Sequence, residues 1–255
     1  MRTGTERFSR ATLGVALLTA LVAVGLVLLL PDVALAGPGG IVKAAARTTV
    51  GKIAFALLIL VFLPFVVYIL GKRALAIRRT RRDLARLAQL YPQYNWLDIR
   101  QQVTAAYTWM WSAWSDEKLE KARRFTTDWY WANQQMLLDD WEAQGLKNVC
   151  KLYHVNHIVP LHFEHRADHG VDGEGSRLIV SISGLVADYM KERATDKVVQ
   201  GDKKSADLEA VWTFVWADGQ WRLNMIEQDA MEYAYLELPN VLPAALRQQS
   251  EAAKG

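Results

Sequence analysis

The chain has 255 residues, of which 51% are hydrophobic and one is cysteine. A mean hydropathy of +0.00 is high for a water-soluble protein and low for a transporter with many spans, so we expect a small membrane part joined to a folded soluble part. The single Cys150 excludes a disulfide framework and a cysteine-based zinc site. Residues 1–86 hold 13 basic and 3 acidic residues, whereas residues 87–255 hold 17 and 24; the acidic larger part argues against nucleic-acid binding.

Residues 1–36 resemble a secretory signal peptide. Their first ten residues contain Arg2, Arg7 and Arg10. An uncharged apolar stretch follows from Ala11 to Leu30, and the segment ends in V-A-L-A before Gly37. This pattern fits cleavage after Ala36. The apolar stretch is also long enough to cross a bilayer by itself, so a signal peptide and a first transmembrane helix are both open. Residues 37–52 are then a short external segment.

Residues 53–71 are predicted to form a transmembrane helix. The sequence IAFALLILVFLPFVVYIL, from Ile53 to Leu70, contains no charged residue. Pro64 does not prevent insertion. The alternative, a buried core helix, is disfavoured because core helices of globular proteins rarely run this long without a polar position.

A dense basic run follows this segment and indicates its orientation. The run consists of Lys72, Arg73, Arg78, Arg79, Arg81, Arg82 and Arg86, with Asp83 as the one acidic residue among them. By the positive-inside rule this end faces the cytoplasm, whether or not residues 1–36 are removed. Residues 72–92 also have a helical apolar period, so we expect an amphipathic juxtamembrane helix with basic side chains at the lipid headgroups. The predicted lipid-binding residues are Lys72, Arg73, Arg78, Arg79, Arg82 and Arg86. A role in fixing topology alone is the alternative.

Residues 93–232 are predicted to form an α+β domain, followed by a C-terminal tail at 233–255. Apolar positions at helical spacing indicate a helix from Trp96 to Trp114, a short helix near 116–125 and a third before Gly145. Thr127 or Asp128 is a candidate cap for the third helix. From Asn148 the period changes to two, and Asp218-Gly219 suggests a tight hairpin. Helices followed by an antiparallel sheet are typical of the α+β class.

These elements resemble the domain family of mitochondrial inner-membrane translocase subunit 44. The resemblance covers roughly residues 86–232. It depends on the helical stretch Trp96–Gly145 and on the later segments GLVADYM, VVQGD and EAVWTFVWADGQWRLNMIEQ. The chain has neither the long Gly/Ser-rich segment common in bacterial relatives nor a mitochondrial transit peptide. It therefore looks like a bacterial inner-membrane member of the family.

The resemblance implies a cone-shaped fold of the nuclear-transport-factor-2-like superfamily and a non-catalytic role as a membrane-proximal docking module. On this interpretation the domain lies in the cytoplasm, contacts an anionic, cardiolipin-like phospholipid and recruits proteins for translocation, insertion or complex assembly. No cofactor is expected, and the family does not identify the partner. Two alternatives are a membrane-tethered cone that binds or converts a small ligand, and a secretion-system component with its domain outside.

Two aromatic residues are predicted to be a partner-binding surface. Trp109 and Trp111 lie off the main apolar stripe of the first helix, and exposed aromatic residues are common interface anchors. The alternative is that they cover the inside of the sheet.

The histidines and aspartates give weaker indications of a site. All five histidines fall within 16 residues: His154, His157, His162, His165 and His169. An offset of three in a strand points side chains to opposite faces, so ordinary sheet positions are favoured over a metal site. Asp188 with Tyr189, and Asp128 with Tyr130, are candidate catalytic pairs, but no nucleophile or phosphate-loop motif accompanies them.

Overall fold

The computed structural model describes residues 49–167, 173–244 and 246. The predicted signal peptide or first span at 1–36 and most of the external segment at 37–52 lie outside these residues. The chain divides into two compact units, Met1–Leu75 and Ala76–Gly255.

Helix α3 (Thr49–Leu87) contains the predicted membrane segment, and Pro64 lies inside it. In the described part of the chain, one helix is long and apolar enough to cross a membrane. Its qualifying segment is Ile59–Leu87, and 11% of the most apolar window is buried inside the protein. The uncharged stretch Ile53–Leu70 of this helix is suited to a lipid environment, because the backbone groups of a helix are satisfied internally.

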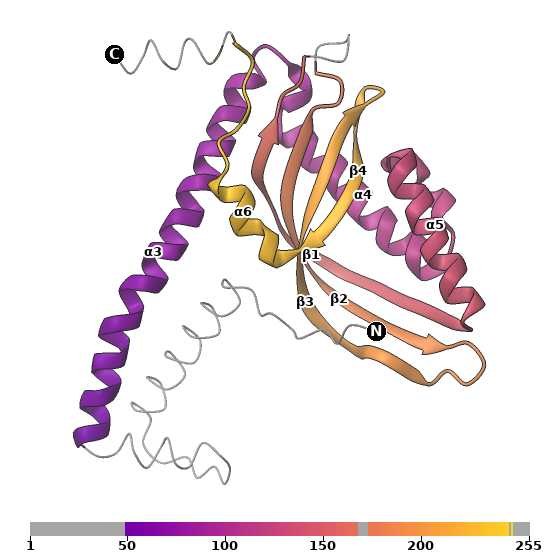
Figure 1. Cartoon of the computed structure of the whole chain (residues 1–255), viewed down its shortest axis with the longest axis horizontal. Helices are drawn as coiled ribbons and strands as arrows, with labels where there is room; N and C mark the ends of the chain where they lie inside the picture. The colour runs from indigo at the N-terminus through magenta and orange to yellow at the C-terminus, as the bar shows by residue number, and fades with distance from the viewer. Residues whose placement is uncertain (1–48, 168–172, 245, 247–255) are drawn as a thin grey trace. The chain divides into compact units, whose positions relative to one another are not determined.

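The second unit is an α+β domain, as the sequence predicts (Figure 1). Four strands form one antiparallel sheet in the order β1-β2-β3-β4. Its elements are η1 (Pro92–Tyr94), α4 (Trp96–Asp116), η2 (Leu119–Phe125), α5 (Asp128–Ala143), β1 (Leu146–Glu164), β2 (Arg177–Glu192), β3 (Val198–Ala217), β4 (Gln220–Gln228), η3 (Asp229–Met231) and α6 (Glu232–Glu237). The β3–β4 turn is the predicted Asp218-Gly219 hairpin, and both residues have positive φ.

The sheet is curved and is covered on both faces. Helices α4 and α5 lie on one side of it (Figure 1), and the main core forms there around Tyr107, Trp212, Phe214 and Trp221. On the other face, a smaller core packs Ala76 of α3 and Leu236 of α6 against the strands. Both faces are therefore removed from water over residues 178–184 of β2 and 211–214 of β3, whereas residues 199–208 of β3 are exposed.

Strand β2 shows the effect of this double cover. From Leu178 to Gly184 every residue is buried, including the two serines Ser181 and Ser183. The polar members are accommodated by hydrogen bonds: the Ser181 hydroxyl donates to Glu209 Oε1 at 2.6 Å. A strand buried on both faces has no solvated side for its polar residues, so each needs a partner within the protein.

Local signals determine where the helices begin and end. Helix α4 begins after Asn95, whose side chain accepts a hydrogen bond from the Leu97 backbone. It ends at Asp116, and the next residue, Glu117, caps it in the left-handed conformation. Helix α5 begins after the predicted cap Thr127, which accepts from the Tyr130 backbone. The short helix predicted near 116–125 is a 3-10 helix, η2, over Leu119–Phe125.

The segment after β4 is integrated into the domain. Val241 forms backbone hydrogen bonds with Phe163 and His165 at the edge of β1. The side chain of Asn240 donates to Asp83 Oδ2 at 2.9 Å and accepts from the Phe163 backbone at 3.3 Å. Residues 76–87 of α3, the edge of β1 and the segment after α6 are thus connected by hydrogen bonds.

Candidate functional site

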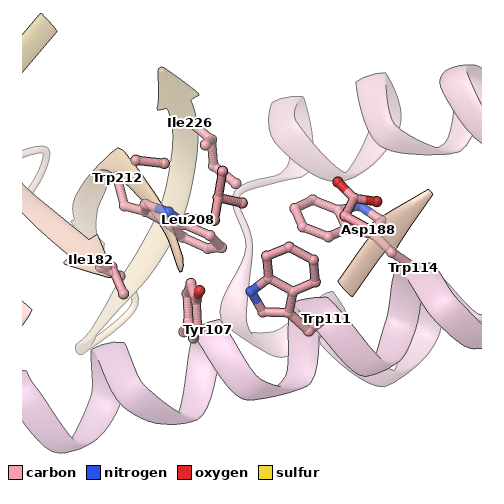
Figure 2. A pocket seen from close by; sticks show the side chains of 9 residues that line it. Tyr107, Trp111, Trp114, Ile182, Asp188, Leu208, Trp212 and Ile226 are labelled. Carbon is pink, nitrogen blue, oxygen red and sulfur yellow. The ribbon is translucent and has the colours of Figure 1, made fainter. Parts of the chain in front are cut away.

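A cavity of about 190 Å³ opens between α4 and the inner face of the sheet (Figure 2). Four of the nine described residues that line it are aromatic: Tyr107, Trp111, Trp114 and Trp212. The rest of the lining is aliphatic except for one carboxylate, and consists of Ile182, Leu208, Ala210, Ile226 and Asp188. Among the residues that the structure describes, no lysine, arginine or histidine lines this cavity.

The four aromatic rings contact one another in a closed circuit. The ring centroids of Tyr107 and Trp111 are 5.9 Å apart, and those of Trp111 and Trp114 are 5.7 Å apart. Trp114 and Trp212 are separated by 6.4 Å, and Trp212 and Tyr107 by 5.0 Å. Each neighbouring pair is inclined by 52–87°. Neighbouring rings therefore pack on one another in edge-to-face or tilted contacts.

Gly184 of β2 provides the room that Tyr107 occupies. A Cβ atom at position 184 would lie 2.8 Å from the Tyr107 hydroxyl and 3.0 Å from the His154 carbonyl oxygen. Glycine in a strand interior often marks such a close approach. Burial raises the pKa of Tyr107 to about 12, with a smaller opposing effect of the Trp111 side chain, so the phenol is neutral at physiological pH.

The polar groups around the cavity are unequally satisfied. The Trp114 indole donates to Gln134 Oε1 at 3.0 Å. In contrast, the buried Nε1 atom of Trp212 makes no hydrogen bond with any part of the chain that the structure describes. Asp188 accepts a hydrogen bond from the Cys150 thiol at 3.5 Å, and burial raises the pKa of Cys150, which keeps it a neutral donor.

The two candidate catalytic pairs are placed differently. Asp188 lines the cavity, but its predicted partner Tyr189 is not among the lining residues. Asp128 forms an ion pair with Arg123 at 2.5 Å, while Tyr130 is buried and its pKa is raised by burial. Neither pair brings an acid and a base together in the cavity.

The predicted lipid-binding residues all lie on α3. Arg78, Arg82 and Arg86 are exposed, as is Arg81, which the prediction omitted. Arg79 is different, because its guanidinium donates to the backbone carbonyls of Leu236 and Leu238 at 3.1 and 2.8 Å. Lys72 is exposed and Arg73 half-buried. The apolar stripe of this helix packs into the domain, since Leu84 and Leu87 are fully buried, and it is therefore not available to lipid.

The expectation of an exposed aromatic pair is wrong for Trp111. Its side chain is 4% exposed, whereas Trp109 is 40% exposed and stacks on Phe125. Helix α4 packs against the sheet and also against η2, so more of its circumference is covered than one apolar stripe predicts. Trp129 at the start of α5 is 59% exposed and was missed as a surface aromatic residue.

The histidines are in separate places in the sheet. His157 contacts Glu209 at 3.2 Å, and His165 hydrogen-bonds the Tyr94 hydroxyl at 2.9 Å. Burial lowers the pKa of His162, and the carboxylate of Glu164 offsets part of this effect. Among the described residues, no group of three potential metal ligands is present; His169 lies outside them.

Comparisons with known proteins identify no family. No family model matches the chain, and no curated protein matches it. Among solved structures, the intermembrane space region of the chloroplast protein ARC6 matches at 9% identity over 51% of this chain and 94% of that chain, with a TM-score of 0.35. An Ntf2-like protein involved in plasmid conjugation matches at 13% identity over 48% and 44%, with a TM-score of 0.28. A candidate polyketide cyclase from Xanthomonas campestris pv. campestris matches at 14% identity over 54% and 98%, with a TM-score of 0.27. The fold assignment therefore depends on the helices and strands described above.

Proposed function

We propose that this protein is a non-catalytic docking module anchored in a bacterial inner membrane, with its α+β domain in the cytoplasm. Arginines of α3 contact anionic, cardiolipin-like phospholipid, and the domain recruits proteins for translocation, insertion or complex assembly. The observation that carries the proposal is the arginine face of α3, defined as Arg78, Arg81, Arg82 and Arg86.

The arginine face lies opposite the side of α3 that enters the domain. At about 100° per residue, the four arginines fall within one side of the helix, and the buried positions Thr80, Leu84 and Leu87 fall on the other. The Arg82 side chain is 63% exposed. Packing of the apolar side thus leaves the basic side accessible, directly after an uncharged helical segment of lipid-compatible length.

The expected strength of lipid binding follows from the number of charges. Each basic residue near an anionic leaflet contributes about 1 kcal/mol at moderate ionic strength. Three of these residues, Arg78, Arg82 and Arg86, therefore contribute about 3 kcal/mol together, which corresponds to about a hundredfold in affinity. Salt screens exposed charges, so this attraction must weaken as ionic strength rises.

A charge-matched pair of triple variants tests this proposal. The full-length protein in uncharged detergent is titrated with cardiolipin, and bound lipid is counted by native mass spectrometry. Replacing Arg78, Arg82 and Arg86 by glutamine should weaken binding about a hundredfold. The control replaces three exposed lysines of the β2–β3 hairpin region by glutamine, namely Lys197, Lys203 and Lys204. It should change binding less than threefold. Equal losses in the two variants, or binding that does not depend on salt, would contradict lipid contact through the arginine face.

Orientation needs a separate measurement. If the domain lies in the cytoplasm, protease added to intact spheroplasts should leave it undigested, and the same protease should digest the domain after lysis. Digestion before lysis would place the domain outside and favour the secretion-system alternative. A photoreactive amino acid at the exposed Trp109 or Trp129 positions would then capture the partner proteins in native membranes.

A further inference from the structure

The cavity under α4 has the composition of a binding site for an organic cation. The described part of its wall contains four aromatic side chains, one carboxylate and no basic side chain. Aromatic rings have electron-rich faces that attract cations within about 6 Å of the ring centroid, and several rings around one point form a cage for methylated ammonium groups. An apolar core does not require this combination.

The distances in the circuit agree with such a cage. Because the four sides measure 5.9, 5.7, 6.4 and 5.0 Å, the point midway among the centroids lies within about 6 Å of every ring. The steep inclination of each neighbouring pair turns the rings in different directions around this point. The volume of about 190 Å³ exceeds the roughly 150 Å³ in which a buried apolar cavity holds benzene, and is sufficient for a trimethylammonium group with a short substituent.

Asp188 supplies the opposite charge. Its side chain is among those that line the cavity (Figure 2), and the Cys150 thiol donates a hydrogen bond to the carboxylate.

We propose that this cavity binds a quaternary ammonium compound of choline type, with the trimethylammonium group among Tyr107, Trp111, Trp114 and Trp212 and its charge balanced by Asp188. The ligand is a free small molecule or the headgroup of a lipid, since both present the same chemistry. The site is independent of the arginine face, which lies on α3 and attracts negative rather than positive groups.

The test compares choline with its uncharged carbon isostere, 3,3-dimethyl-1-butanol. The full-length protein is placed in nanodiscs of phosphatidylglycerol, which contain no choline, and binding is followed by ligand-observed NMR titration. Choline should bind at least tenfold more tightly than the isostere, because only the cation is attracted to the rings and to Asp188. Equal affinities, or no saturable choline binding, would overturn the proposal.

Two variants with the same change of charge separate the site from general electrostatics. D188N keeps the shape of the cavity and should weaken choline binding about five- to tenfold without affecting the isostere. D202N is the control, because Asp202 pairs with Asp188 across β2 and β3 but does not line the cavity; it should leave both affinities unchanged. Equal effects of D188N and D202N on choline would refute a role of Asp188.

A further measurement tests the rings without altering their shape. Biosynthetic replacement of tryptophan by fluorinated tryptophan weakens the negative ring face and should lower the preference for choline over its isostere. An unchanged preference would overturn the cage. Nanodiscs that contain phosphatidylcholine distinguish the two sources of ligand: a lipid headgroup at the site would lower the apparent affinity for free choline, and a free ligand would not.

Discussion

Gly184→Ala is the perturbation for which the structure gives the most direct expectation. The added Cβ atom would meet the Tyr107 hydroxyl at 2.8 Å, the His154 carbonyl oxygen at 3.0 Å and Leu152 Cδ1 at 3.3 Å. The carbonyl belongs to the backbone of the neighbouring strand and cannot withdraw freely, and Tyr107 is 2% exposed. Overpacking of a filled core costs about 1–3 kcal/mol, so G184A should destabilise the domain by this amount.

A double-mutant cycle with Tyr107→Phe isolates the shortest of these contacts. Y107F deletes the hydroxyl oxygen and leaves the ring, so the same alanine at position 184 then meets only the two longer contacts. We expect G184A to cost about 1 kcal/mol less in the Y107F background than in the wild type, which is a common size for the coupling energy of two residues in contact.

Fluorescence-detected denaturation measures the four stabilities. All ten tryptophans lie between Trp96 and Trp221, so their emission in the full-length protein reports on the domain and not on the membrane segment. Additive effects of the two substitutions would refute the packing of Tyr107 against Gly184, and with it the position of this wall of the cavity.

Three other predictions concern charge and pH. N240D places a second carboxylate beside the buried Asp83 and should destabilise the domain by about 2 kcal/mol at pH 7; denaturation at pH 4 should recover part of this loss, and a pH-independent deficit would contradict it. The folded-state pKa of Tyr107 is raised from 10.0 to about 12, so the stability that the neutral phenol contributes is fully present below pH 10 and is lost as the pH rises towards 12. Y107F should therefore make the fall in the free energy of unfolding over this range less steep. An unchanged slope would refute the effect. E117Q removes the carboxylate that pairs with Arg193 and a neighbouring lysine and should cost about 0.5–1 kcal/mol at neutral pH. Burial alone would raise the pKa of Glu117, but the hydrogen bonds and charges of Arg193 and Lys147 together lower it. The deficit should therefore shrink as the pH falls below about 4.5 and should be absent from denaturation curves at pH 2.

The parts of the fold that depend on short-range chemistry were accessible from the sequence. Ile99, Val103 and Tyr107 are spaced at the helical period, which depends only on the geometry of a single helix, and all three are buried in α4. The Thr127 cap and the Asp218-Gly219 turn likewise depend on residues that are adjacent in the chain. Such features need no knowledge of tertiary contacts.

The cavity was not accessible in this way, because it combines α4 with three strands. Asp188 was a candidate base beside Tyr189, but a register shift between Val186 and Asp188 changes the local alternation of the strand, and only the folded sheet shows which residues it faces. Gly184 within an apolar strand was the one local signal of a close approach. The burial of Trp111 depends on two separate contacts of α4, which periodicity does not reveal.

The hydrogen bonds of Val241 with β1 have a consequence for self-association. Strand β1 is at the end of the sheet order, and an outermost strand with vacant amides and carbonyls can template the addition of foreign chains. Here Val241 occupies the groups of Phe163 and His165, and Pro160 offers no amide hydrogen a few residues earlier. Addition of a foreign strand at this end of β1, around Phe163 and His165, would first require that the segment containing Val241 be displaced.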